Sequence, residues 1–190
     1  MMIHTDYTLP MTLILIQGVL GALDTLYYHE YRYRLPAYAT ESRDELRLHG
    51  IRDLIYGLLF ITLSQVAWGG LWSWALLALI FAEVIITLAD FVIERRVRSA
   101  WGGLATGELV MHALMAILYG AFITTLAPHW WAWSALESGF HFHAQPLSPW
   151  MVNALSLMGC GVTIAGLRDL LLSTLWLPKA WRKRLAFPWR

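Results

Sequence analysis

Five long apolar segments, joined by short polar connections, constrain this sequence more than any other feature. A membrane hydrocarbon core about 30 Å thick is crossed by roughly 20 helical residues. The segments that reach or approach this length are 10–30, 46–68, 71–94, 104–127 and 150–177. The composition agrees, since 58% of the 190 residues are hydrophobic and only 14% are charged, against about 25% charged residues in soluble proteins. We predict an all-α integral membrane bundle of five transmembrane helices, forming a single membrane domain over residues 1–190 with a basic aromatic tail at 178–190.

The basic residues predict the orientation of this bundle. Lys and Arg are retained on the cytoplasmic side of membrane helices. Here they lie in the connection after the first segment, in the connection after the third and in the tail, and they are absent from the N-terminal segment, from Gly69–Gly70 and from Pro128–Pro149. We therefore expect the N-terminus outside and the C-terminus in the cytoplasm, in a bacterial inner membrane. Gly69–Gly70 predicts a tight helical hairpin, and Pro128 predicts the end of the fourth helix.

Ionisable residues inside the apolar segments are the second unusual feature. Each costs about 2.5–3.5 kcal/mol at the centre of a membrane helix, so each needs a partner. Residues three, four or seven apart share one face of a helix. The resulting polar stripes are His49, Arg52, Asp53 and Tyr56 on the second segment, Glu83, Thr87 and Asp90 on the third, and Glu108 and His112 on the fourth, with Asp24 on the first. Most of these residues fall roughly 5–14 Å from the cytoplasmic helix ends.

This concentration of carboxylates and imidazoles predicts a metal site. Carboxylates at short range cannot all remain ionised without positive charge nearby, and Arg52 and Arg168 supply only part of it. The predicted ligands are Asp24, His49, Asp53, Glu83, Asp90, Glu108 and His112, and we expect Asp53, Asp90, Glu108 and His112 to lie within a few Å of one another. A carboxylate-rich set favours iron, as one or two ions, over copper. Manganese, zinc and haem b are the alternatives.

The site predicts a function by its chemistry. Two His and carboxylate pairs that face each other are similar in logic to the di-iron sites of ferritin-like bundles, although the spacing here is four residues rather than three. We therefore expect a membrane-embedded non-haem di-iron oxidoreductase, of the hydroxylase or desaturase type, that acts on a lipophilic substrate from the cytoplasmic leaflet. Arg52 and Tyr56 are the predicted catalytic residues.

Two other functions are compatible with the same residues. A b-type haem electron-transfer subunit would use His49 and His112 as axial ligands, and a non-catalytic accessory subunit of a larger membrane complex would use the polar stripes only to join helices. The expected partners are the lipid bilayer, a lipophilic small molecule, and a redox partner or a membrane-complex subunit, but no nucleic acid.

The remaining features are read as structural. His29 and Glu30, next to Arg32 and Arg34, are expected to form a solvated charge cluster at the interface. The connection that contains His141 and His143 is expected to lie on the membrane surface. Small residues permit close helix contacts, and the expected ones are Gly18, Gly21, Gly159, Gly161 and Gly166.

Overall fold

The computed structural model describes residues 6–143, 147–174, 176 and 179–185, and most of these are helical. The long helices are α1 (Thr8–Asp24), α2 (Arg43–Leu63), α3 (Leu71–Arg98), α4 (Thr106–Ser134) and α5 (Pro149–Ser173). The short elements are the π-helix η1 (Thr25–Arg32), the 3₁₀ turns η2 (Leu35–Tyr38) and η3 (Ser99–Trp101), the strands β1 (Val66–Gly69) and β2 (Gly139–Phe142), and α6 (Lys179–Leu185). The predicted all-α class is confirmed.

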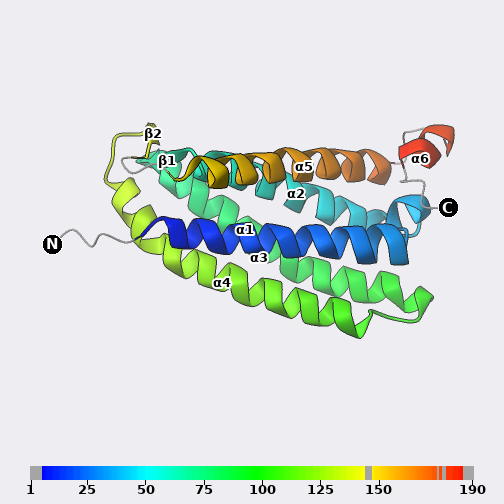
Figure 1. Ribbon diagram of the computed structural model, residues 1–190. Coiled ribbons are helices and arrows are strands. Elements are labelled where there is room, and N and C mark those ends of the chain that lie inside the picture. The colour runs from blue at the N-terminus through cyan, green and yellow to red at the C-terminus, as the bar shows by residue number, and fades with distance from the viewer. Residues whose placement is uncertain (1–5, 144–146, 175, 177–178, 186–190) are drawn as a thin grey trace.

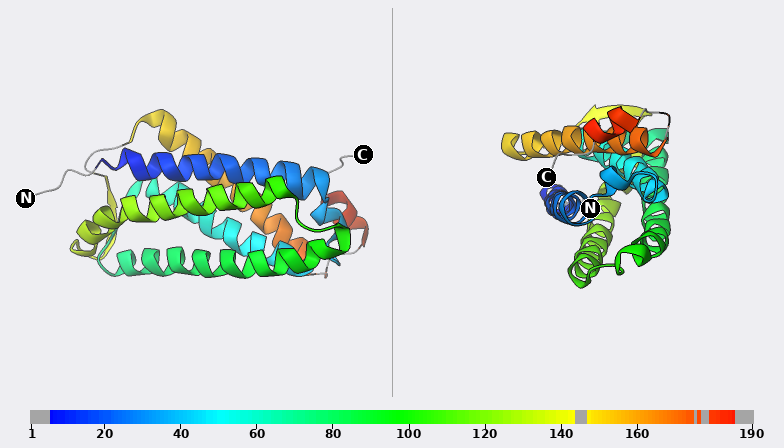
Figure 2. Two further views of the ribbon diagram at one scale, coloured as in Figure 1. Left: turned by 90° about the horizontal axis from the view of Figure 1, so that it is seen from below. Right: turned by 90° about the vertical axis from the view of Figure 1, so that its right-hand side faces the viewer.

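The long helices lie side by side along one axis (Figure 1). Seen end-on, they follow one another around the bundle in the order α5, α2, α3, α4 and α1 (Figure 2). The end of α1, the start of α2 and the ends of α3 and α5 lie together, and we call this the basic end because Arg43, Arg98 and Arg168 belong to it. The strands β1 and β2 lie at the opposite end.

Two helices are longer than predicted. α3 continues past residue 94 to Arg98, and α4 continues through Pro128 to Ser134. Proline removes a helix hydrogen bond, but tertiary contacts hold the following turns: Trp130 Nε1 donates to the Ser73 carbonyl at 2.7 Å, and the Trp133 carbonyl accepts from the Gly70 amide at 3.0 Å. The fifth helix is shorter than predicted, since α5 ends at Ser173 and not at residue 177. Residues 178 and 186–190 of the predicted tail lie outside the described residues.

A strand of a two-stranded ribbon, and not the expected tight turn at Gly69–Gly70, leads from α2 to α3. β1 pairs antiparallel with β2, with Val66 opposite Phe142 and Gly69 opposite Gly139. Gly70 then has a φ of 57°, which glycine adopts without strain. α2 therefore ends at Leu63 and not at the predicted residue 68, and residues 64–70 join it to α3. The predicted two-residue connection was wrong because the backbone groups of β1 pair with a distant strand, which no local pattern reveals.

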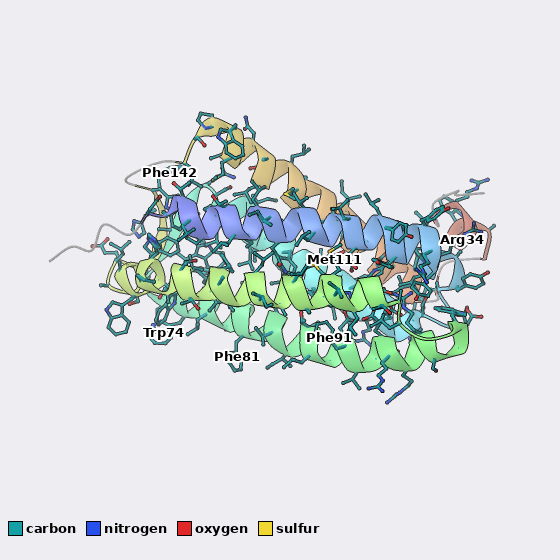
Figure 3. The ribbon with its side chains drawn as sticks, turned by 60° about the horizontal axis from the view of Figure 1, so that its bottom comes forward. Arg34, Trp74, Phe81, Phe91, Met111 and Phe142 are labelled. Carbon is teal, nitrogen blue, oxygen red and sulfur yellow. The ribbon has the colours of Figure 1, made fainter. Side chains whose placement is uncertain are left out.

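Within the part of the chain that the structure describes, four stretches are long and apolar enough to cross a membrane: Thr8–Arg32, Leu71–Trp101, Thr106–Ser134 and Pro149–Ser173. Their outer faces suit lipid, since Trp74 and Phe81 of α3 point away from the bundle (Figure 3) and are 54% and 66% exposed. α2 has 21 residues but is not among the four, because its first half is rich in charged side chains. The fifth span therefore stays a prediction.

Glycine contacts hold α2 against α5. A Cβ atom at Gly57 would lie 3.1 Å from the Gly159 carbonyl oxygen, and one at Gly50 would lie 2.8 Å from the Gly166 carbonyl oxygen. The two contacts lie seven residues apart on each helix, so they repeat after two turns. The expected close approach is therefore present at Gly159 and Gly166. It is not present at Gly161, where a Cβ atom would meet nothing within 4 Å.

These contacts predict a position-specific loss of stability. We expect Gly159→Leu to lower the free energy of unfolding by about 1–3 kcal/mol, because overpacking forces the two backbones apart. Gly161→Leu, two residues away on the exposed side of α5, is the matched control and should have little effect. Thermal unfolding of the detergent-solubilised protein measures both, and equal losses for the two variants would contradict the packing.

Candidate metal centre

A buried polar cluster lies between the helices near the basic end. All of its members are largely inaccessible to solvent and come from α1, η1, α2, α3 and α4. They are Asp24, His29, Glu45, His49, Asp90, Glu94, Arg98, Glu108 and His112. So many ionisable side chains in one apolar bundle must neutralise one another or bind a cation.

Four of these residues converge on one point. Asp24, His29, Glu108 and His112 each place a ligand atom within 4.8 Å of the other three. His112 Nε2 lies 3.2 Å from Asp24 Oδ2, while His29 Nε2 lies 3.5 Å from the same oxygen and 3.6 Å from Glu108 Oε1. Two imidazoles and two carboxylates form a donor set that suits iron, manganese or zinc. We call this group the four-ligand site.

The π-helix η1 explains how His29 joins this site. At 100° per residue, an α-helix would place His29 about 140° around the axis from Asp24. In a π-helix the hydrogen bonds run from residue i to i+5, so residues five apart lie closer to one face than they do in an α-helix. Asp24 and His29 therefore face the same side. π-helical turns inside α-helices are frequent at functional sites.

A second buried group lies beside the first and shares His29 with it. Its members are His29, Glu45 and His49. The rings of His29 and His49 are stacked, with centroids 4.5 Å apart and 5° between their planes. His49 Nε2 lies 3.1 Å from Asp90 Oδ2, and Arg52 Nη1 donates to the same oxygen at 2.8 Å.

Arg98 holds the carboxylates at the basic end of the cluster. Its Nη2 atom donates to Glu45 at 2.7 Å, to Glu108 at 3.2 Å and to Glu94 at 3.3 Å. The guanidinium is fully buried and lies 3.9 Å from the centroid of the Tyr33 ring, a cation–π contact. A single arginine therefore joins α2, α3 and α4.

The hydrogen bonds and ion pairs within the cluster leave several of its buried polar atoms without a hydrogen-bond partner. Among the described residues, eight of its buried atoms have no hydrogen-bond partner. They are the donors Arg98 Nε and Nη1, together with Asp24 Oδ1, His29 Nε2, Glu45 Oε2, Asp90 Oδ1, Glu94 Oε2 and Glu108 Oε2. Buried polar atoms are nearly always partnered in native proteins. Most of these unpartnered atoms are hydrogen-bond acceptors, and a bound cation would satisfy them.

The structure brings together only part of the predicted ligand set. Asp24, Glu108 and His112 belong to the four-ligand site, and His49 belongs to the second group. Asp90 lies beside them as the partner of His49 and Arg52.

Asp53 and Glu83 lie outside both groups. Asp53 faces α5, where a Cβ atom at Gly166 would lie 2.7 Å from Asp53 Cβ. The expected convergence of Asp53 with Glu108 and His112 was therefore wrong, because the close packing of α5 occupies that side of α2. Glu83 lies deeper in the bundle, where it accepts from Thr87 Oγ1 at 2.7 Å and from Tyr56 Oη at 3.0 Å. Of the two predicted catalytic residues, Arg52 thus borders the cluster and Tyr56 contacts Glu83.

Sequence reasoning missed His29, Glu45, Glu94 and Arg98. His29 and Glu30 were expected in a solvated charge cluster at the interface, but both are buried, and Glu30 pairs with Arg168. Arg98 was read as a residue of a basic loop, but α3 extends to include it. The spacing of Glu94 and Arg98, four residues apart and so on one helix face, was the available signal.

A cavity of about 700 Å³ adjoins the four-ligand site. Asp24 and His112 lie in its wall, together with apolar side chains from all five long helices, such as Phe60, Met115 and Met158. Its volume falls within the range of about 300–1,000 Å³ that is typical of small-molecule sites. The four-ligand site therefore borders a space that fits an organic molecule.

Comparisons with known proteins returned no likeness. No family model matches the chain, and neither a curated protein nor a solved structure matches it.

The Arg98 contacts predict that this residue stabilises the bundle. We expect Arg98→Met to lower the free energy of unfolding by about 3–5 kcal/mol, because three buried carboxylates lose their cation. Arg95→Met changes an exposed arginine of the same helix and should cost much less. Chemical unfolding in detergent measures the difference, and two variants of similar stability would refute the role of Arg98.

Proposed function

We propose that this chain is an integral membrane metalloprotein that binds iron at Asp24, His29, Glu108 and His112 and oxidises a lipophilic substrate. The convergence of these four ligand atoms within 4.8 Å, beside the cavity, is the observation that carries the proposal. His29 belongs to both buried groups, and it would have to use both ring nitrogens to bind an ion in each. We therefore propose one iron ion and not the expected pair.

Iron is favoured by the donor set. Two imidazoles with carboxylates resemble the two-His, one-carboxylate sets of non-haem iron oxygenases, in which other coordination positions stay open. In a hydroxylation of this class, dioxygen, two electrons and two protons insert one oxygen atom into a C–H bond and release one water molecule. The electrons would come from a redox partner.

The haem alternative receives less support from the geometry. A haem between His49 and His112 would need a ring nitrogen of each to face an apolar space. His49 Nε2 faces Asp90 instead, and His112 faces Asp24 with Nε2 and Glu94 with Nδ1, at 3.2 Å and 3.4 Å. A non-catalytic accessory subunit is the second candidate, because the ion pairs of Arg98 join three helices without any metal.

The topology proposed here has five spans, with α2 as the fifth and the basic end in the cytoplasm. The charged half of α2 packs on the cluster, and the α2 contacts with α5 continue over the length of both helices. Arg95 and Arg96 lie exposed at the same end. This arrangement agrees with the retention of arginine on the cytoplasmic side, and the bacterial inner membrane is the proposed location.

Metal analysis of the purified protein tests the function. We expect about one iron ion per chain, and we expect Asp24→Asn and His112→Ala to lose most of it, because each removes a ligand atom. Asp53→Asn and Glu83→Gln are matched controls, and they should retain the iron because neither residue belongs to the four-ligand site. Metal-free wild-type protein that co-purifies with a membrane partner would instead support the accessory subunit.

Cysteine accessibility tests the topology. In a Cys160→Ser background, Glu137→Cys at the ribbon end and Ser99→Cys at the basic end place one thiol on each side, both at exposed positions. A membrane-impermeant maleimide added to intact cells should label the first variant and should label the second only after lysis. The reverse result would invert the proposed orientation.

A further inference from the structure

The helices that surround the metal centre carry a second polar layer, on the side away from the basic end. On each of four helices, a polar residue of the cluster has a polar partner seven residues away: Asp24 and Gln17, His49 and Tyr56, Asp90 and Glu83, and His112 and Tyr119. Seven residues make two turns, so both members face the same side, about 10 Å apart along the axis. We call Gln17, Tyr56, Glu83 and Tyr119 the second polar layer.

These four side chains meet in the structure. Tyr56 Oη donates to Glu83 Oε1 at 3.0 Å, and Gln17 Nε2 donates to Tyr56 Oη at 3.4 Å. The rings of Tyr56 and Tyr119 lie 5.8 Å apart in an edge-to-face arrangement. Gln17, Glu83 and Tyr119 are all more than nine-tenths buried, at 7%, 2% and 6% exposure.

The second polar layer is incompletely satisfied. Gln17 Oε1, Glu83 Oε2 and Tyr119 Oη have no hydrogen-bond partner among the described residues. All four residues of the layer line the same cavity as Asp24 and His112. Between the two polar regions, the wall includes the apolar side chains of Val84, Leu88 and Met115, together with Thr87, Arg52 and Asp53. The cavity therefore has polar groups at two levels, with apolar side chains between them on α3 and α4.

We propose that this cavity binds a neutral lipophilic molecule with a single hydroxyl group, held at the second polar layer. A hydroxyl both donates and accepts, so it can donate to Glu83 or Gln17 and accept from Tyr119. A carboxylate would meet the acidic side chain of Glu83, while Arg52 of the cavity wall is already paired with Asp90. A pure hydrocarbon would leave the polar atoms unpartnered, which is costly when they are buried.

The carbon skeleton of this ligand extends from the second polar layer toward the four-ligand site. Carbon atoms that are about 10 Å from the hydroxyl group of the ligand then lie next to Asp24 and His112. Leu26 and Leu88 belong to the cavity wall and are also 58% and 60% exposed on the surface of the bundle. The cavity thus reaches the lipid-facing surface, from which such a molecule can enter. The identification of this molecule as a substrate rests on the proposed function, but its binding does not.

Photocrosslinking tests the binding site. The purified protein in nanodiscs is labelled with a long-chain primary alcohol that carries a diazirine, and dodecanol and dodecane are the competitors. We expect the label on cavity-lining peptides, and we expect dodecanol to compete at least about tenfold better than dodecane, because only the alcohol satisfies the buried polar atoms. Equal competition, or label confined to the outer surface, would overturn the inference.

Variants assign the recognition to named side chains. Tyr119→Phe and Gln17→Leu should each weaken labelling by the alcohol, whereas Tyr31→Phe, an exposed tyrosine of η1, should leave it unchanged. Unaltered labelling of both cavity variants would also overturn the inference. The metal content of the same samples separates the two proposals. Alcohol binding by a metal-free protein refutes the oxidoreductase and supports the alcohol-binding site. Bound metal without alcohol binding refutes the alcohol-binding site and supports the metal centre.

Discussion

The cost of burying charge in an apolar bundle is the constraint on which the rest of this structure depends. An isolated ion in a low-dielectric interior is unfavourable by many kcal/mol, so buried carboxylates need cations and hydrogen-bond donors within contact distance. Arg98 meets this need for Glu45, Glu94 and Glu108, and Arg52 and His49 meet it for Asp90. All of these contacts except Arg98 with Glu94, which lies within α3, join different helices. The ion pairs that make the charges tolerable therefore also fix how the helices face one another.

Glycine packing and the metal centre are two consequences of the same arrangement. Backbone contacts at Gly50 and Gly57 bring α5 close to α2, and Asp53 packs against α5 beside Gly166. On the other side, α1 ends in the π-helix η1, which adds His29 to the site. The helices that are not in backbone contact leave a cavity between them, and polar layers two turns apart line it. The close packing of α2 against α5 thus fixes these two helices, and the cavity between the helices forms a binding site.

The local sequence pattern predicted much of this protein, and the errors have identifiable causes. Helical periodicity placed Asp24, Glu108 and His112 on inward faces at one level, and the structure brings these three side chains together. The α-helical period does not predict the position of His29, because it places this residue about 140° from Asp24, whereas the chain forms a π-helix there. It failed at Asp53, because periodicity gives the direction of a side chain about its own helix axis and does not say which neighbour lies there. It also failed at Gly69, whose strand partner is distant in the chain.

The sequence by itself determined that the chain is helical, that its surface suits lipid and that its ionisable residues gather toward one end. These properties depend on composition, segment length and spacing along single helices, which are local. Only the tertiary structure decided which carboxylates Arg98 pairs with, which four ligand atoms converge and where the cavity lies. Those outcomes depend on the relative rotation of packed helices, which is set by long-range contacts such as Gly57 with Gly159 and by the π-helical turn.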